Sequence, residues 1–429
     1  MTSEQSRKDH YAAHSGVEGS QLKGLFLGAG ASCELGMPLV WELTAELKHH
    51  ITPERLRQIN AAAIPRGFSF PDDVIEDAIS MMSRSDVHYE HLLGYLEVQR
   101  VRARNLHQDY YGLNEWFTEL VYRALYLRHK QRLLKIIPGL RFIDGIATLA
   151  EENKPLWVFT TNHDVVVDCL AAALKIPISY GFLGSKSFPR RDAAGTIVGS
   201  LHAQMLSKDD IDNGRYTFFG PGTKGINVIK IHGGLETFRF NDSESEVLRL
   251  LPFDDTPAGP ILSLISANEE VYHPQARLSG VSATNQIAYA DEVGELQFLR
   301  RTLLAGTFKY DERHPQVLPR MFLPLFRDSI IYVSHLVCIG YSFGDDHIDE
   351  IMRGWLEVTK QRRLEIVSPS AAVPSTLKHI APQVSVVHQK WMAYLEPLSP
   401  RPLTLDERAL KAGLEAMHKT LSEDFNTTR

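Results

Sequence analysis

Three polar side chains in this sequence directly follow short apolar runs, at positions suited to proton transfer and ligand binding. His232 comes after the apolar run 226–231 and precedes two glycines. A histidine there faces open space, and imidazole is the side chain best matched to proton transfer near neutral pH. Asn162 and Asp164 follow the apolar run 155–159, in the order Thr-Thr-Asn-His-Asp. Nothing local requires an amide at Asn162, whereas Asp164 is equally suited to capping the next helix.

A glycine-rich turn near the N-terminus could hold a phosphate group. Gly28 and Gly30 follow the apolar run 25–27 in the order Gly-Ala-Gly-Ala-Ser, and Gly-Met-Pro stands at 36–38. Glycine lets the backbone turn tightly and approach a ligand, and a strand–turn–helix arrangement directs backbone N–H groups toward a pyrophosphate. The spacing meets only half of the dinucleotide motif Gly-x-Gly-x-x-Gly, so a purely structural turn is an equal alternative.

The sequence predicts buried strands that alternate with helices, and these elements must position the residues described above. Four apolar runs end in glycine or polar residues, at 25–27, 155–159, 226–231 and 336–340, and two further short strands are expected near 365–367 and 384–387. This alternation predicts an α/β fold, a Rossmann-like, mostly parallel sheet with helices on both faces. The carboxyl ends of parallel strands share one edge, where ligands bind in open sheets, so we expect the four strand ends to lie together.

One large domain is predicted over 21–400, preceded by a mobile N-terminal arm (1–20) and followed by a C-terminal helix (401–429). Residues 72–137 read as a helical insertion laid beside the sheet, for which simple packing is the alternative to a functional role. Long loops are expected at about 185–225 and 241–290, where Gly, Ser, Asp and Pro are frequent. Helices are expected at 291–305 and 319–334.

The composition limits the classes of function. The chain has 429 residues, of which 44% are hydrophobic and 23% charged, and its net charge is −6. These values are those of an ordinary globular protein and give no support to direct nucleic-acid or membrane binding. The sequence contains no apolar run long enough for a transmembrane helix and no apolar signal core at 1–14, so we expect a cytoplasmic protein.

The number and spacing of the cysteines also limit the classes of site. Cys33, Cys169 and Cys338 are three in number and far apart. Their spacing excludes a zinc ribbon and makes a disulfide framework improbable, so all three are expected to be buried small hydrophobic residues, and no metal is expected.

Taken together, the motifs resemble the sirtuin family, and more closely its sirtuin-like branch in bacterial antiphage defence. That pattern contains Gly-Ala-Gly-x-Ser with a later Gly-x-Pro, then Thr-Gln-Asn-x-Asp, then His-Gly after a strand, then a Gly-[Thr/Tyr]-Ser turn. This chain matches it at 28–32, 36–38, 160–164, 232–233 and 340–342, with Thr161 in place of the glutamine. The resemblance covers roughly 20–185, 226–236 and 330–390.

The resemblance implies that the domain at 21–400 is a catalytic domain that binds NAD. It assigns the pyrophosphate to Gly28, Ala29, Gly30 and Ser32. It further implies that Asn162 holds the nicotinamide ribose or the attacking water, that Asp164 holds the carboxamide, and that His232 is the general base. Thr161 would alter the contacts to the ribose hydroxyls. Gly340 and Ser342 would border the adenosine half.

The sirtuin deacylases carry a four-cysteine zinc module, which three scattered cysteines cannot supply. The defence branch lacks that module and hydrolyses NAD, so the resemblance implies an NAD hydrolase that yields nicotinamide and ADP-ribose in antiphage defence, with the helical insertion in place of the zinc module. A protein deacylase or ADP-ribosyltransferase, a non-catalytic NAD or ADP-ribose sensor, and a scaffold are the alternatives. By the same resemblance we expect a homo-oligomer and a HerA-type hexameric ATPase as partner.

Overall fold

The computed structural model describes residues 22–241, 245–272, 284–303 and 319–426. The expected N-terminal arm at 1–20 lies outside these residues. Within them, a seven-stranded sheet forms the centre of the molecule, and every pairing in it is parallel. The order of its strands is β13 (Val384–Val387), β12 (Arg363–Val367), β11 (His335–Ile339), β1 (Lys23–Leu27), β2 (Leu156–Thr160), β6 (Ile226–Lys230) and β3 (Ile178–Ser179).

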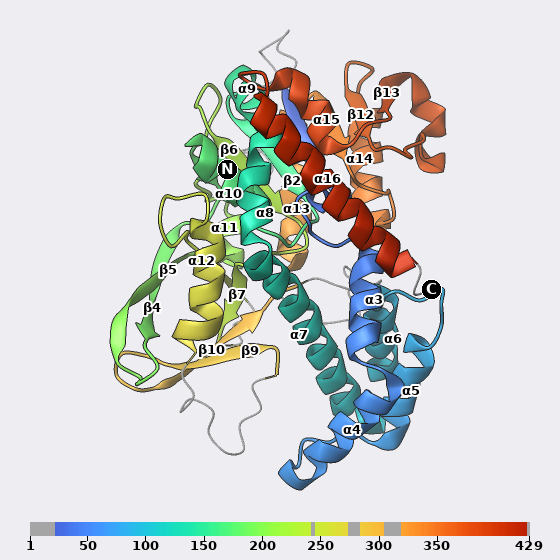
Figure 1. Ribbon diagram of the computed structural model, residues 1–429, viewed down its shortest axis with the longest axis vertical. Coiled ribbons are helices and arrows are strands. Elements are labelled where there is room, and N and C mark those ends of the chain that lie inside the picture. Colours follow the sequence, from blue (N-terminus) through green and yellow to red (C-terminus); the bar gives the residue numbers. More distant parts are fainter. Residues whose placement is uncertain (1–21, 242–244, 273–283, 304–318, 427–429) are drawn as a thin grey trace.

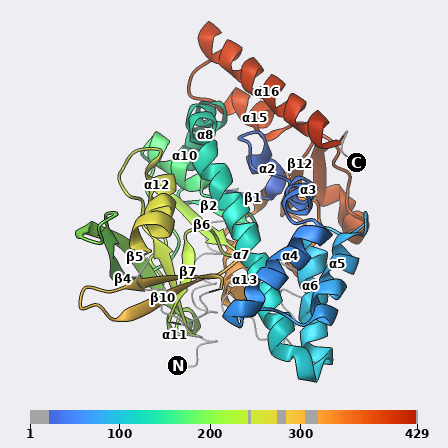
Figure 2. The ribbon, with the colours of Figure 1, turned by 60° about the horizontal axis from the view of Figure 1, so that its bottom comes forward.

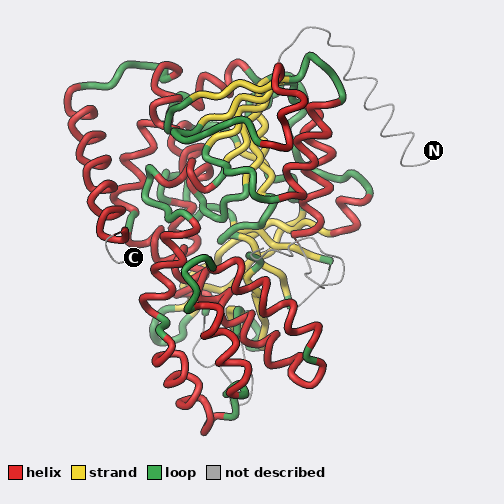
Figure 3. The backbone as a smooth tube through the Cα atoms, turned by 90° about the vertical axis from the view of Figure 1, so that its right-hand side faces the viewer, coloured by secondary structure: helices red, strands yellow, loops and turns green. Residues whose placement is uncertain are grey.

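The central strands are buried on both faces, as is typical of a parallel sheet. All five residues of β2 and all five of β6 are buried, and burial of both faces is what distinguishes parallel strands from half-exposed antiparallel ones. Helices cover the sheet on either side (Figure 3). The predicted Rossmann-like α/β fold is therefore confirmed, with each of the four apolar runs forming a strand.

A group of helices extends from one end of this sheet (Figure 1). Its members are α3 (Val40–His50), α4 (Pro53–Ala63), α5 (Asp72–Met82), α6 (Tyr89–Arg102), α7 (His107–Gln131) and α8 (Leu133–Gly139). The segment 72–137 is thus helical between short connections, and α3 and α4 precede it in the chain. Helix α7, with 25 residues, is the longest of the described helices, and it lies between α4, α5 and α6 on one side and a second sheet on the other (Figure 2).

That second sheet was not predicted. It has six strands, each pairing antiparallel, in the order β4 (Gly184–Arg191), β5 (Ile197–Ser207), β8 (Glu246–Leu250), β7 (Thr237–Phe240), β10 (Leu296–Arg301) and β9 (Gln286–Ala290). The loops expected at about 185–225 and 241–290 were therefore wrong over much of their described length. Residues 242–244 and 273–283 of the second stretch lie outside the described residues. Helix α12 (Gly259–Ser266) also falls in that stretch.

The helix expected at 291–305 was wrong as well, because residues 296–301 form β10. Leu296, Leu299 and Leu303 recur at helical spacing, but cross-strand pairing with β9 on one side and β7 on the other fixes the segment as a strand. Strands β4 and β5 expose much of one face, so they lack the continuous apolar runs that identified the first sheet.

The rest of the chain returns to the first sheet. Helix α10 (Val166–Leu174) follows β2, α13 (Pro319–Ser329) precedes β11, and α14 (Asp346–Glu357) follows it. The predicted C-terminal helix region contains α16 (Leu405–Asn426), which lies across α3 and α8. Over the residues described, no helix combines the length and the apolar character that crossing a bilayer requires.

Candidate functional site

The four strand ends singled out in the sequence lie at one edge of the first sheet. Strands β11, β1, β2 and β6 are neighbours in that order, and Leu27 is in register with both Ile339 and Thr160. Thr160 is in register with Lys230, and the Ile231 N–H donates to the Thr160 carbonyl at 2.8 Å. The segments after these strands therefore begin at the same level, as expected.

The glycine turn after β1 packs against the loop after β11. The Gly28 N–H donates to the Ile339 carbonyl and the Gly30 N–H to the Gly340 carbonyl, both at 2.9 Å. A Cβ on Gly28 would lie 2.6 Å from the Gly340 carbonyl oxygen, and Gly340 itself has a φ of +64°. Glycine at these positions is therefore required by the close approach of two backbone segments. Ala29 and Ser32 lie in the short helix α2 (Ala29–Cys33) that the turn opens into.

Asn162 joins the end of β2 to this turn. Its Nδ2 donates to the Gly28 carbonyl at 2.9 Å and to the Ser32 hydroxyl at 3.1 Å. Its Oδ1 is buried and has no hydrogen-bond partner among the residues described. A buried acceptor without a partner is costly, so this atom is suited to accept from a bound ligand or an ordered water. Thr161, beside it, is half-buried, and its N–H donates to the Leu27 carbonyl.

His232 contacts a carboxylate that the sequence analysis missed. Its Nε2 lies 3.1 Å from Oδ2 of Asp345, and the two side chains are only 6% and 12% exposed. The Asp345 Oδ1 accepts from the Ile348 N–H at 3.4 Å and caps α14. A carboxylate on one imidazole nitrogen orients the ring and stabilises its protonated form, which is the arrangement of a general base. In the sequence, the contact was indicated only by the position of Asp345 between the end of a strand and the start of a helix.

Asp164 has a structural role in this edge. Its Oδ1 accepts from the Val166 N–H at 3.0 Å, at the start of α10, and its carbonyl accepts from the Lys230 ammonium at 2.6 Å. One carboxylate oxygen of Asp164 thus satisfies the first N–H of α10, although the N-cap position itself is Val165. The neighbouring His163 ring lies 6.2 Å from the His232 ring, measured between centroids.

The loop after β11 carries the remaining predicted residues, Gly340 and Ser342. Between them, Tyr341 packs its ring 4.9 Å from that of Phe26 and donates its hydroxyl to Asp349 Oδ1 at 2.8 Å. Burial raises the pKa of Asp349 to about 6. The side chain of Ser342 is exposed, so it borders the edge without being fixed in it.

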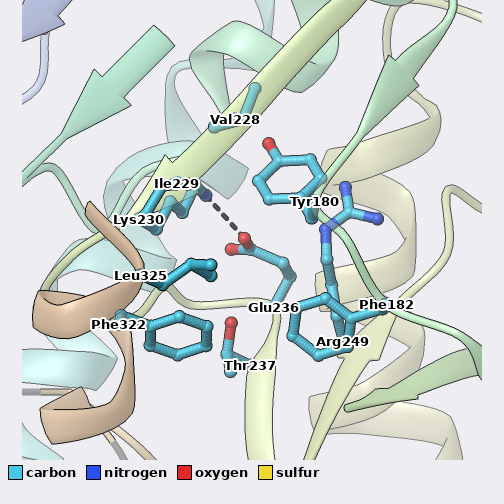
Figure 4. Close-up of a pocket in the computed structure, with 11 residues that line it drawn as sticks. Tyr180, Phe182, Val228, Ile229, Lys230, Glu236, Thr237, Arg249, Phe322 and Leu325 are labelled. Atoms are coloured by element: carbon cyan, nitrogen blue, oxygen red, sulfur yellow. Dashed lines mark ion pairs between the residues drawn. The ribbon is translucent and has the colours of Figure 1, made fainter. Parts of the chain in front are cut away.

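A buried ionic cluster surrounds Lys230, two residues before His232, and Figure 4 shows its residues Lys230, Glu236, Arg249 and Tyr180. Lys230 Nζ is 2.6 Å from Oε1 of Glu236 and 3.7 Å from Oδ2 of Asp168, and Arg249 pairs with the other oxygen of Asp168. Tyr180 donates its hydroxyl to Asp168 at 2.7 Å. Burial raises the pKa of the Glu236 carboxyl, and the Lys230 charge opposes that rise. Two cations balance two anions, so the cluster is self-contained, and it lines a small pocket together with Phe182 and Phe322.

The cysteines are free thiols, and Cys169 and Cys338 are buried. Burial raises the pKa of the half-buried Cys33 thiol to about 12, so it is not a reactive thiolate near neutral pH. Among the described residues, no group of three or more His, Cys, Asp or Glu side chains is arranged to hold a metal ion.

The chain is similar to solved structures at low sequence identity. No protein-family model matches the chain, and no curated protein sequence matches it. Among solved structures, a Sir2 homolog–NAD complex is 11% identical, with 94% of each chain covered and a TM-score of 0.36. Sir2Tm bound to a propionylated peptide is 12% identical, covering 91% of this chain and 96% of that one, with a TM-score of 0.31. Identities and TM-scores this low do not assign the chain to a family.

Proposed function

We propose that this protein hydrolyses NAD at the bond between nicotinamide and ribose. The observation that carries the proposal is the buried His232–Asp345 pair on the same sheet edge as Asn162, whose Oδ1 is buried and without a partner. A general base, a buried acceptor and a glycine turn at the carboxyl edge of a parallel sheet are the groups that such a hydrolysis needs. The resemblance of the motifs to sirtuins supports NAD as the substrate.

The proposed reaction needs no group besides NAD and water. The bond between C1′ of the ribose and the nicotinamide nitrogen breaks, and nicotinamide leaves as a neutral base with the bonding electron pair. Water then adds to the oxocarbenium-like C1′ and gives a proton to His232, which Asp345 stabilises in its charged form. Asn162 Oδ1 accepts from the attacking water or a ribose hydroxyl. Nicotinamide, ADP-ribose and a proton are the products.

The remaining predicted residues have supporting roles in this proposal. Backbone N–H groups and the hydroxyl of the glycine-turn segment, Gly28, Ala29, Gly30 and Ser32, would face the pyrophosphate. Thr161 and Asp164 would lie near the nicotinamide ribose and its carboxamide. Gly340 and Ser342 would border the adenosine half.

The test is incubation of the purified full-length chain with NAD alone, following nicotinamide and ADP-ribose by chromatography. We expect release of both by the unsubstituted protein and by His202→Ala, a matched control that removes an exposed histidine of β5. His232→Ala should lower the rate about 10²- to 10⁴-fold, the usual contribution of a general base. Asn162→Ala should also lower it strongly. Thermal unfolding of each variant establishes that it is folded.

The alternatives give different results in the same experiment. Release that requires an added acetylated peptide would replace hydrolysis with deacylation or transfer. Absence of release under both conditions would contradict the hydrolase proposal for the isolated chain, and calorimetric titration with NAD would then identify a sensor. Wild-type activity in His232→Ala would remove His232 from the mechanism.

A role in antiphage defence, a homo-oligomer and a HerA-type ATPase partner remain proposals that rest on the resemblance alone. An NAD hydrolase must be inactive until needed, because unrestrained loss of NAD kills the cell. Co-purification with such an ATPase from cells expressing both, and the mass of the isolated chain in solution, are the measurements that test them.

A further inference from the structure

Helix α7 contacts both of the loops that carry the proposed catalytic residues. The Tyr122 hydroxyl donates to the Leu235 carbonyl at 2.9 Å, three residues after His232. The Val165 N–H, three residues after Asn162, donates to His129 Nε2 at 3.4 Å. Tyr122 and His129 are seven residues apart, so they lie on the same face of the helix two turns from one another.

The hydrogen bonds of His129 define a single state of its ring. Nδ1 lies 2.8 Å from the Leu125 carbonyl, which can only accept, so Nδ1 carries the hydrogen. Nε2 must then be the acceptor that the Val165 N–H requires. The residue is 1% exposed, and burial lowers the pKa of the imidazole, opposed by the nearby Asp164 carboxylate and reinforced by Lys230. A neutral, fixed histidine in this setting is a support for the backbone of the Asn162 loop.

Tyr122 is fixed just as closely. Asn268 donates its amide to the Tyr122 hydroxyl at 3.1 Å, and the Arg301 guanidinium lies 4.7 Å from the ring centroid. The two loops are also joined directly, because the Leu235 N–H donates to the His163 carbonyl at 2.9 Å. The backbone of each loop is therefore held both by the other loop and by α7.

We propose that Tyr122 and His129 are positioning residues, through which α7 sets the spacing between Asn162 and His232. Tyr122 and His129 hydrogen-bond to backbone groups of the two loops, so they act through the loop backbones. The catalytic part of this inference rests on the proposed function, whereas the structural part does not. Displacement of reacting groups by about 1 Å can cost about 10²-fold in rate, so loss of either hydrogen bond should lower kcat and leave KM nearly unchanged.

The first test compares Tyr122→Phe with Tyr126→Phe by amide hydrogen exchange of the full chain. Tyr126 lies one turn further along the same buried face, and its hydroxyl donates to Glu269 Oε1 at 2.5 Å instead of to a site loop. We expect faster exchange of peptides covering 231–236 in Tyr122→Phe, with little change there in Tyr126→Phe. Equal exchange of this segment in the two variants would overturn the role of Tyr122.

The second test compares His129→Gln with His129→Leu. The glutamine side-chain oxygen can occupy the place of Nε2 and accept from the Val165 N–H, whereas leucine keeps the bulk and offers no acceptor. We expect His129→Leu to lower kcat about 10-fold or more and to speed exchange over 161–166, and His129→Gln to restore both. A purely packing role for His129 predicts that the glutamine variant is no better than the leucine variant, which would overturn the proposal.

These readouts separate this inference from the proposed function. Hydrogen exchange requires no NAD, so it decides whether α7 holds the loops even if the unsubstituted chain releases no nicotinamide. If the chain does hydrolyse NAD and the exchange of both loops is unaffected in Tyr122→Phe and His129→Leu, the positioning role fails while the hydrolase proposal stands.

Discussion

Asp345 contacts two different parts of the molecule with its two carboxylate oxygens. Oδ1 caps the N-terminus of α14 through the Ile348 N–H, and Oδ2 faces His232 Nε2 at 3.1 Å. Because the helix holds the carboxylate in place, the imidazole is oriented without depending on a mobile side chain. The stability of the helix start and the orientation of the base are thus supplied by one residue.

The two roles can be separated by Asp345→Asn. Asparagine caps helices as well as aspartate does, so we expect thermal stability close to that of the unsubstituted chain. The amide carries no charge to stabilise a protonated imidazole, so kcat for NAD hydrolysis should fall about 10²-fold, the lower end of a general base's contribution. Asp346→Asn, at the exposed neighbouring position, is the control and should retain activity. Retention of full activity by Asp345→Asn would show that His232 needs no carboxylate.

Asn162 and His232 could be predicted from the sequence because each directly follows an apolar run, and strand ends in a parallel sheet meet at one edge. Asp345 could not be predicted. It follows β11, which β1 and β2 separate from β6 in the sheet, so only the path of the loops brings it to His232. The sequence also left the role of Asp164 open between capping and binding, and in the structure Asp164, one residue before the N-cap Val165, accepts from the first N–H of α10 through its Oδ1.

Between elements, the closest approach at the site is that of the glycine turn after β1 and the loop after β11. Gly340 has a φ of +64°, and a Cβ there would lie 2.6 Å from Gly30 Cα. Two loops whose backbones touch leave no room for independent movement. The geometry of the turn therefore depends on β11 as much as on β1.

Gly340→Ala should destabilise the chain by at least about 2 kcal/mol, because alanine is strained at this φ and its methyl group meets backbone atoms that cannot move aside. Gly354→Ala is the matched control. Gly354 lies in α14 with nothing within 4 Å of an added Cβ, so alanine should stabilise the protein by about 0.5–1 kcal/mol. Chemical denaturation of both variants measures the difference, and equal stabilities would refute the close approach.

The two sheets differ in how well the sequence predicted them, for a physical reason. Strands buried on both faces are rich in apolar residues, as in β2 and in the Ile-Asn-Val-Ile-Lys of β6, and this is visible in the sequence. Strands β4 and β5 expose one face and contain polar and glycine residues, so they resemble loops until their partners are known. For β10, the spacing of its leucines favoured a helix, and only its pairing on both edges shows it to be a strand.

For the molecule as a whole, the buried ionic cluster connects the two sheets. Arg249 belongs to β8 of the antiparallel sheet, whereas its partner Asp168 belongs to α10, next to the parallel sheet. Lys230 of β6 pairs with Glu236, just before β7. Such pairs favour one relative arrangement of the sheets, because a charge displaced from its partners would remain buried and uncompensated.

Arg249→Met should lower the free energy of unfolding by about 3 kcal/mol, because Asp168 would stay buried with one of its two cations removed. Arg57→Met is the control. It removes an arginine of the same kind from the exposed pair with Glu76, where both side chains are about half exposed, and should leave the unfolding midpoint nearly unchanged. Similar losses in the two variants would show that the cluster does not hold the sheets together.

The pairing of β1 with β11 has a consequence for how the chain is made. Lys23 pairs with His335, so the central strand of the sheet acquires its second neighbour only after the distant segment around His335 has been synthesised. Contacts between such distant segments form late, because the intervening chain must be ordered first. Gly340 and Asp345 complete the site from the same late segment, so an unfinished chain on the ribosome cannot assemble it. A protein proposed to consume NAD would thus become active only after the segment that carries Asp345 has been synthesised.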